Sequence, residues 1–279
     1  MSSVLIQGAS LTRASIQRLQ ELTGASAHVV VSSSVAQLTG AAVPLSPAAR
    51  SFARDERVDL TVVPRPLLAG EFRLLAMDMD STLITIECID EIADLVGVKP
   101  QVKEITEAAM RGEVDFAGAL RRRVALLAGL EVAKLEQVYT ERLKLSPGAE
   151  HLLEFARRSG WKTLLVSGGF TFFTDRLKGR LGLDHTLANT LEVKDGRLTG
   201  HVSGAIVDAE GKAAEVRRIC GLLGCPTTAA VVVGDGANDL RMMADAGWSV
   251  AFHAKPVVQE KAHMAINFNG LEALPQIFQ

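Results

Sequence analysis

Two aspartates two residues apart, Asp78 and Asp80, directly follow an apolar segment of the chain. The sequence predicts that segment, residues 72–77, to be a buried β-strand. Because alternate residues of an extended chain point the same way, both carboxylates are expected to face one crevice at the carboxyl end of the strand. Neighbouring carboxylates repel each other, so the pair needs a cation, and oxygen ligands suit Mg²⁺. The pattern therefore predicts a magnesium site, with a further carboxylate elsewhere to complete it.

A second acidic cluster, Asp235 and Asp239, stands in the segment GDGAND after the apolar run 229–233. Gly234 and Gly236 permit a sharp turn there, and the chain then enters a predicted helix. The carboxyl ends of parallel strands gather at one edge of a sheet, so Asp235 is predicted to complete the metal site.

Groups suited to phosphate follow a third apolar run, residues 161–166. Ser167, Gly168 and Gly169 precede a helix predicted to begin near Phe170, and they offer a hydroxyl and free backbone N–H groups. Lys212, in a helix-opening segment, supplies a mobile positive charge for phosphate oxygens. Taken singly, these motifs are also typical of turns, calcium-binding loops or surface lysines. Their order along the chain, with three of the four closing an apolar strand, favours phosphoryl chemistry.

The strands expected to carry these motifs alternate with helices. Apolar runs at 72–77, 161–166, 229–233 and 248–252 indicate a parallel sheet covered on both faces by helices. The stretch between the first two runs is longer than one crossover helix requires and looks helical, so an inserted helical cap is predicted at about residues 86–145. Asp195-Gly196, between alternating residues, indicates a β-hairpin over 187–201.

The first part of the chain has a different rhythm. Five elements are predicted before residue 64: strands at 4–7, 27–32 and 58–63, and helices at 12–22 and 47–54. A proline-containing linker follows at 64–66. The sequence thus predicts a small N-terminal α+β domain, residues 1–66, and a larger α/β domain, residues 67–279.

The bulk properties point to a small-molecule ligand. Charged residues make up 22% of the chain and nearly cancel, to a formal net charge of −2, so no basic field attracts nucleic acid or an anionic membrane. Cys88, Cys220 and Cys225 lack the spacing of a zinc site and fit a reducing cytosol. No apolar stretch reaches membrane-spanning length, and the N-terminus lacks a basic segment followed by a long apolar run. We therefore expect a soluble, cytoplasmic protein.

The combination of DMDST, SGG, Lys212 and GDGAND resembles the haloacid dehalogenase superfamily of phosphohydrolases over essentially all of residues 71–279. The resemblance implies a Rossmann-like core, an inserted cap and phosphoryl transfer onto an aspartate. Asp78 is then the nucleophile, while Mg²⁺ and Lys212 neutralise charge on the phosphate oxygens. Asp80 is the general acid that protonates the leaving alkoxide and afterwards the base that activates water. Their environments must therefore keep Asp78 ionised and Asp80 protonated at the moment of attack.

The same resemblance implies the metal ligands, namely the Asp78 carboxylate, the backbone carbonyl of Asp80 and Asp235. It also implies that Asp239 orients a metal-bound water and that Asn238 contacts phosphate or substrate. The other phosphate contacts are expected from residues named above, Ser167, Gly168 and Lys212.

The predicted cap resembles that of the phosphoserine phosphatases in this superfamily. In DMDSTLITIECIDEI, Glu87 holds the position of a glutamate that meets the substrate ammonium, and in LRRRV, Arg123 holds that of a residue that binds the substrate carboxylate. The resemblance also places Met110 and Phe116 on the apolar side of the pocket. A glutamate and an arginine together require a zwitterion, so the implied reaction is hydrolysis of O-phospho-L-serine, the last step of serine biosynthesis. Without the resemblance, Glu87 is also typical of a helix N-terminus, and residues 121–123 of a solvated basic face.

Other functions share these motifs. A phosphotransferase or mutase would pass the phosphoryl group to an acceptor other than water, and a phosphatase for another small phosphomonoester would fit if Arg123 pointed elsewhere. A sensor that only binds phosphorylated ligands is disfavoured, because the full set of catalytic residue types is present. The N-terminal domain resembles amino-acid-binding domains of the ACT type, although it is short of a strand. A scaffolding or dimerising role is the alternative, which leaves a homodimer open.

Overall fold

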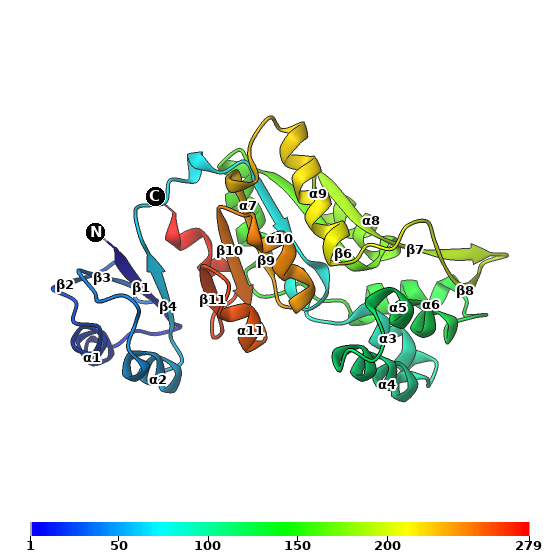
Figure 1. Cartoon of the computed structure of the whole chain (residues 1–279), viewed down its shortest axis with the longest axis horizontal. Helices are drawn as coiled ribbons and strands as arrows, with labels where there is room; N and C mark the ends of the chain where they lie inside the picture. The colour runs from blue at the N-terminus through cyan, green and yellow to red at the C-terminus, as the bar shows by residue number, and fades with distance from the viewer. Residues whose placement is uncertain (1, 279) are drawn as a thin grey trace.

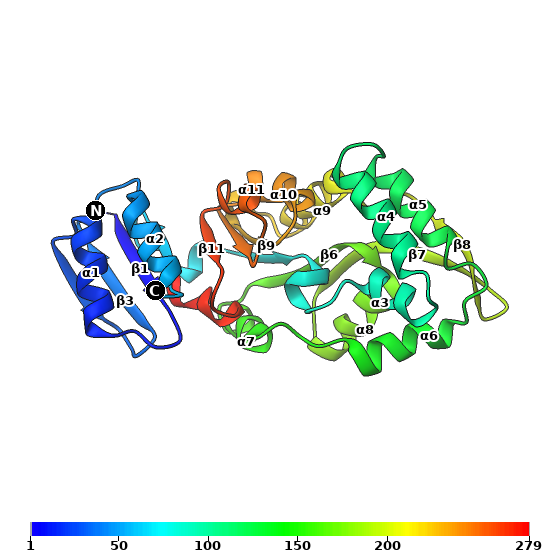
Figure 2. The same ribbon diagram turned by 90° about the horizontal axis from the view of Figure 1, so that it is seen from below.

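The computed structural model describes residues 2–278 and contains two separate β-sheets. Figures 1 and 2 show an elongated molecule with the small N-terminal sheet at one end, the larger sheet in the middle and a group of helices at the other end. The residues singled out for chemistry belong to the middle and to the helical end.

A four-stranded antiparallel sheet in the order β2-β3-β1-β4 forms the N-terminal unit, and two helices pack on one face. Its elements are β1 (Ser3–Gln7), α1 (Arg13–Thr23), β2 (Ala27–Val30), β3 (Val35–Thr39), α2 (Pro47–Asp55) and β4 (Asp59–Val63). Thr12 and Ser46 cap the two helices through their hydroxyls, and Gly24 ends α1 in the left-handed conformation. Strand β3 is absent from the sequence-based prediction, because its five residues follow a run of serines and gain strand character only between β1 and β2. It supplies the strand that the module was expected to lack.

The larger sheet has seven strands in the order β11-β10-β9-β5-β6-β7-β8. All neighbours are parallel except the antiparallel pair β7 and β8. The strands are β5 (Leu74–Met77), β6 (Lys162–Phe170), β7 (His185–Lys194), β8 (Arg197–Ser203), β9 (Ala230–Gly234), β10 (Trp248–Phe252) and β11 (Met264–Ile266). The four predicted apolar strands are confirmed, as is the hairpin, whose turn residues Asp195 and Gly196 have φ of 50° and 73°. Only the three-residue edge strand β11 lacks a counterpart in the prediction.

Helices cover both faces of this sheet, as predicted for an α/β fold. One apolar core lies under α7 (Ala149–Arg158) and α8 (Thr171–Leu181). The other lies under α9 (Ala209–Leu222) and α10 (Leu240–Ala244). A short helix, α11 (Pro256–Gln259), follows β10. Adjacent strand residues such as Leu74 and Leu75 therefore enter different cores, which explains why the strands are apolar throughout.

The insertion after β5 is helical. It comprises α3 (Cys88–Leu95), α4 (Lys99–Met110), α5 (Phe116–Ala125) and α6 (Val132–Gln137), with a last turn at Val138–Arg142. Its two connections to the sheet pair with each other through Ile84 and Leu145. Figure 2 shows these helices together at the end farthest from the N-terminal unit. No helix within residues 2–278 combines the length and apolar character needed to cross a membrane.

Buried polar contacts join the N-terminal unit to the larger sheet. The carboxylate of Asp59, which begins β4, accepts hydrogen bonds from the backbone N–H groups of residues 267–269 at 2.8–3.3 Å. The Gln7 side chain donates to the Ala273 carbonyl and to Gln276 Oε1, both at 2.7 Å. Because a buried carboxylate is costly to leave without partners, these bonds fix the orientation of the two units.

Candidate active site

Asp78 is the first residue after β5 and caps an irregular turn, Met79–Leu83. Its Oδ1 accepts a hydrogen bond of 2.7 Å from the backbone N–H of Met79. Its Oδ2 lies 2.7 Å from Lys212 Nζ. The buried side chain therefore stands where it was predicted, at the carboxyl end of a central parallel strand.

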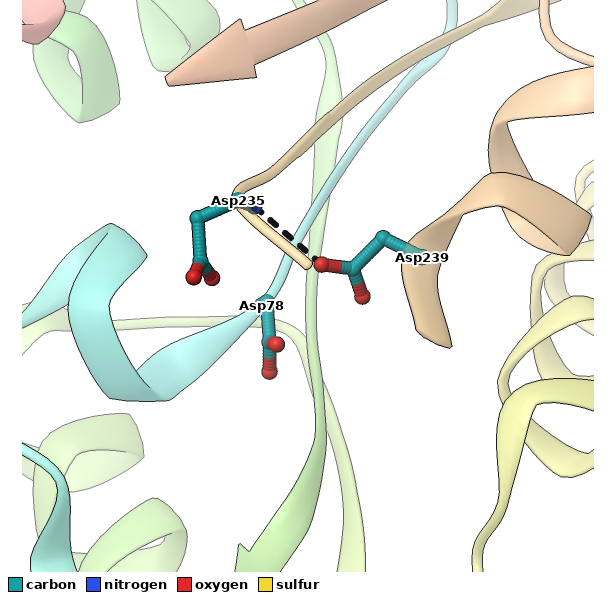
Figure 3. Close-up of side chains that lie close together, drawn as sticks. All are labelled: Asp78, Asp235 and Asp239. Carbon is teal, nitrogen blue, oxygen red and sulfur yellow. Dashed lines mark hydrogen bonds between the residues drawn. The ribbon is translucent and has the colours of Figure 1, made fainter. Parts of the chain in front are cut away.

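Three carboxylates converge at this edge of the sheet, as Figure 3 shows for Asp78, Asp235 and Asp239. One oxygen of each lies within 4.8 Å of the others. Thr82 Oγ1 donates to Asp235 Oδ1 at 3.1 Å. Asp239 Oδ2 accepts from the backbone N–H groups of Asp235 and Gly236 at 3.2 and 3.1 Å. Asp239 is thus tied to its own turn, while Asp78 and Asp235 line a cavity.

Lys212 is held rigidly, so the prediction of a mobile charge is wrong. It lies in the first turn of α9, whose N-cap Asp208 accepts a hydrogen bond from the backbone N–H of Gly211 at 2.8 Å. Its side chain is 1% exposed, and Nζ contacts Asp78 Oδ2 at 2.7 Å and Asp239 Oδ1 at 2.9 Å. Burial lowers the pKa of Lys212, but the charges of Asp239 and Asp78 raise that pKa overall. The lysine is therefore a permanent cation that fixes two carboxylates.

The acidic cluster carries more negative charge than Lys212 balances. Burial raises the pKa of Asp78 well above its usual range, and the charge of Asp239 raises it further. The same two causes, in the same order, raise the pKa of Asp235 to about 6. A divalent cation between these oxygens would relieve the repulsion, and an all-oxygen donor set suits Mg²⁺.

Asp80 lies apart from the three converging carboxylates. Its Oδ1 accepts a hydrogen bond of 3.2 Å from the backbone N–H of Cys88, the first residue of α3. Burial, followed by the charge of Glu87, raises the pKa of Asp80 to about 7. A carboxyl group with that pKa can both donate and accept a proton near neutrality.

The Ser167-Gly168-Gly169 segment forms the end of β6, which continues to Phe170, where a helix start was predicted. Ser167 Oγ accepts a hydrogen bond of 2.9 Å from the backbone N–H of Gly169. This N–H is therefore not free, in contrast to the prediction. The glycines make room for their neighbours. A Cβ atom would lie 2.7 Å from Asp80 Oδ2 at Gly169 and 2.9 Å from the ring of Phe116 at Gly168.

The cap contributes two opposite charges, Glu87 and Arg123, to the same cavity. Within residues 2–278 neither side chain takes part in an ion pair. Arg123 donates weak hydrogen bonds of 3.4 Å to Thr106 Oγ1 and to the Ala119 carbonyl. Burial raises the pKa of Glu87 and lowers the pKa of Arg123. Both shifts disfavour the ionised forms, so a ligand that carries the two opposite charges would stabilise them.

The other predicted cap residues differ in how far they reach into the cavity. The side chains of Arg121 and Arg122 are exposed, so of the three consecutive arginines only Arg123 lines the cavity. Phe116 and Met110 also line it, but Met110 is 65% exposed and lies at the rim.

The cavity has a volume of about 530 Å³ and lies between the sheet edge and the cap. It contains the predicted Asn238 and three polar residues that were not predicted, Asp90, Thr106 and Lys255. Lys255 follows β10, so the rule that ligands bind at strand ends could have found it. Asp90 is three residues after Glu87 on the same helix, whereas nothing in the sequence distinguishes Thr106 from other cap residues.

Comparison with known proteins gives three consistent results. The family model for haloacid dehalogenase-like hydrolases matches residues 75–244. A phosphoserine phosphatase of Polaromonas sp. is 52% identical over 223 residues, which cover 78% of this chain and 94% of the relative. Among solved structures, a HAD family hydrolase of Salmonella enterica serovar Typhi superimposes with a TM-score of 0.90 at 34% identity, covering 100% of this chain and 99% of that one.

A probable phosphoserine phosphatase of Vibrio cholerae superimposes with a TM-score of 0.85 at 38% identity, covering 99% of this chain and 85% of that one. Both structural matches include the N-terminal unit, because they cover nearly the whole chain. Sequence, fold and the arrangement at the sheet edge therefore agree, and the chain belongs to the haloacid dehalogenase-like hydrolases, in the branch of the phosphoserine phosphatases.

Proposed function

We propose that this protein is a magnesium-dependent phosphatase that hydrolyses O-phospho-L-serine to L-serine and phosphate, the last step of serine biosynthesis. The observation that carries the proposal is the cavity itself. Its floor holds Asp78 and Asp80, while its cap wall holds Glu87 and Arg123. Phosphate chemistry and zwitterion recognition are thus combined in one space of about 530 Å³, large enough for a small amino-acid ester.

Asp78 is the proposed nucleophile. Its carboxylate oxygen attacks phosphorus, a new O–P bond forms, and the bond between phosphorus and the serine oxygen breaks. The contacts of Asp78 with Met79 N–H and Lys212 fix the direction of the carboxylate, and the charge of Lys212 opposes the rise in the pKa of Asp78 that burial and Asp239 cause. These contacts prepare Asp78 for attack in line with the leaving group.

Asp80 is the proposed general acid and base. With a pKa raised to about 7, it is substantially protonated near neutrality and can give its proton to the departing serine oxygen. It then takes a proton from the water that attacks the phospho-aspartate on Asp78. The backbone N–H of Cys88 holds one oxygen of Asp80 in place for both steps.

The transferring phosphoryl group needs positive charge and hydrogen-bond donors around it. Ser167, the backbone of Gly168, Lys212 and Asn238 are the proposed contacts. Bound Mg²⁺ would supply further positive charge, and the Asp78 carboxylate, the Asp80 carbonyl and Asp235 would hold it.

Glu87 and Arg123 are proposed to select the substrate. Glu87 binds the ammonium group, and the guanidinium of Arg123 binds the carboxylate, with Met110 and Phe116 beside the aliphatic part. A substrate without the carboxylate leaves the half-buried Arg123 unpaired, and one without the ammonium group loses its contact with Glu87, so either loss lowers reactivity.

The test is phosphate release by the purified protein from L-phosphoserine, D-phosphoserine, phosphothreonine, phosphoethanolamine and glycerol phosphate, with and without Mg²⁺. Strong preference for L-phosphoserine, lost with EDTA, supports the proposal. Equal turnover of phosphoethanolamine or glycerol phosphate would instead favour a phosphatase for another phosphomonoester. A phosphotransferase would form new phosphate esters when an alcohol such as L-homoserine is added.

We further propose a division at residues 66 and 67 into an N-terminal domain and a catalytic domain whose cap spans about residues 86–145. The N-terminal domain is proposed to have a scaffolding or dimerising role, with amino-acid binding as the alternative. The contacts of Asp59 and Gln7 with the larger domain support the scaffolding role. Light scattering tests for a homodimer, and L-serine inhibition tests for amino-acid binding.

We also propose a cytoplasmic location. The free cysteines, two of them buried, support it.

A further inference from the structure

Ser81 has an unusual backbone conformation in the turn between β5 and the cap. Its φ is 54° and its ψ is 4°, in the left-handed region that non-glycine residues seldom adopt. Its backbone N–H donates to the Ile86 carbonyl at 3.2 Å, which closes the loop that leads into α3. This loop brings the Ser81 side chain next to Glu87, six residues later.

The Ser81 hydroxyl donates a hydrogen bond of 2.7 Å to Glu87 Oε1. Within residues 2–278 this is the one hydrogen bond of the Glu87 carboxylate, and no ion pair holds it. Glu87 is the N-cap of α3, but its side chain makes no capping hydrogen bond. A carboxylate at this position would otherwise be drawn toward the free N–H groups of the helix. Glu87 is exposed, so this contact with the half-buried Ser81 is what directs its carboxylate.

The neighbouring hydroxyl, on Thr82, points to a different carboxylate. Thr82 Oγ1 donates to Asp235 Oδ1 at 3.1 Å. Two consecutive side chains of one turn thus hold one acid of the proposed metal site and one acid of the proposed ammonium site. Asp78 caps this turn and Asp80 lies within it. The turn therefore sets the positions of four acids relative to one another: Asp78, Asp80, Glu87 and Asp235.

We propose that Ser81 is a positioning residue for the substrate ammonium group, acting through Glu87. The inference rests on the proposed function, since it concerns the same cavity. Removal of the Ser81 hydroxyl would let the Glu87 carboxylate rotate toward the start of α3. Binding of an ammonium-bearing substrate would weaken, while phosphate chemistry at Asp78 would continue.

Three variants separate this role from a purely structural role in the turn. Ser81→Gly removes the hydroxyl and suits the positive φ, whereas Ser81→Thr keeps the hydroxyl but places a branched side chain in a strained conformation. Thr85→Ala is the matched control, because Thr85 lies in the same loop and its hydroxyl donates to the Lys144 carbonyl, outside the cavity. Steady-state kinetics with L-phosphoserine and with its deamino analogue, phosphorylated 3-hydroxypropionate, provide the measurement.

For Ser81→Gly we expect KM for L-phosphoserine to rise about tenfold, the scale of one hydrogen bond to a charged group, with kcat changed less than about twofold. KM for the deamino analogue stays unchanged, and Thr85→Ala stays near the wild type with both substrates. Ser81→Thr keeps the wild-type ratio of the two KM values, because it retains the hydroxyl and its backbone strain affects both substrates alike. The role of Ser81 would be overturned if Ser81→Gly showed the wild-type KM for L-phosphoserine, or if its KM rose equally for both substrates. A wild-type enzyme with no preference for L-phosphoserine over the analogue would overturn the proposed function itself, and this inference with it.

Discussion

The ammonium group of Lys212 lies 2.7 Å from Oδ2 of Asp78, and the two side chains are only 1% and 7% exposed. Asp239 contacts the same ammonium group at 2.9 Å and is completely buried. Two buried acids therefore depend on one lysine for their compensating charge. The contact is therefore expected to stabilise the fold, because neither carboxylate has a second cation nearby among residues 2–278.

Replacement of Lys212 by Met is expected to abolish turnover and to destabilise the metal-free protein by about 3–5 kcal/mol, because two buried carboxylates lose their partner. Urea denaturation at pH 7 in EDTA measures the free energy of unfolding. Lys162→Met is the matched control, since Lys162 pairs with Asp184 on the surface, and it should cost less than about 1 kcal/mol. Equal costs for the two variants would contradict the assignment of Lys212 as a buried structural cation.

Replacement of Arg123 by Ala should alter substrate choice. We expect kcat/KM for L-phosphoserine to fall about 100-fold, because the substrate carboxylate loses a charged donor in a partly enclosed site. Phosphoethanolamine, which has no carboxylate, should be affected only a few-fold. Arg122→Ala provides the control, because the adjacent side chain is exposed and does not line the cavity. Parallel losses with both substrates would show that Arg123 supports the cap rather than the carboxylate.

Replacement of Asp235 by Asn should stabilise the metal-free protein in a pH-dependent manner. Burial and the charge of Asp239 raise the pKa of Asp235 from 3.8 to about 6. A raised pKa means that this group's stabilising contribution is complete below pH 3.8 and is lost as the pH rises through 6. Asparagine has no proton to lose, so the free energy of unfolding of the variant should exceed that of the wild type by about 1–3 kcal/mol at pH 8.

Thermal unfolding at pH 4 and pH 8, with EDTA or Mg²⁺, measures this difference. Mg²⁺ should raise the Tm of the wild type at pH 8 and should have little effect on the variant. Asp94→Asn is the control, and its Tm at pH 8 should fall below that of the wild type. The reason is that the hydrogen bond from Arg142 lowers the pKa of Asp94, so the ionised Asp94 stabilises the protein. A Tm rise with Mg²⁺ that is the same in wild type and Asp235→Asn would exclude Asp235 as a metal ligand.

Replacement of Gly169 by Ala should lower kcat about tenfold or more, because the new methyl group would lie 2.7 Å from Asp80 Oδ2 and displace that carboxylate. Gly179→Ala in α8 meets no atom within 4 Å and should be neutral or slightly stabilising. Rates with L-phosphoserine and circular-dichroism spectra of both variants test the prediction. An unchanged kcat for Gly169→Ala would mean that Asp80 has room to adjust.

The sequence by itself determined the architecture of the larger sheet and the placement of the acids. Strands that are buried on both faces must be apolar at every position, so β5, β6, β9 and β10 are visible as continuous apolar runs. The residue types after those runs indicate which strand ends carry the acids, and Asp78 and Asp235 indeed meet at one edge. The turn Asp195-Gly196 was visible because few residues adopt positive φ.

Tertiary structure alone decided what depends on partners distant in the chain. Strand β3 pairs with β1 on one side and β2 on the other, and β11 is too short to leave a periodic pattern. The rigidity of Lys212 arises from two acids, 134 residues before it and 27 residues after it, so no local pattern announces it. The bond between Ser81 and Glu87 depends on a left-handed serine that local preferences disfavour. Periodicity reports which face of an element is buried, whereas these contacts depend on how the elements meet in space.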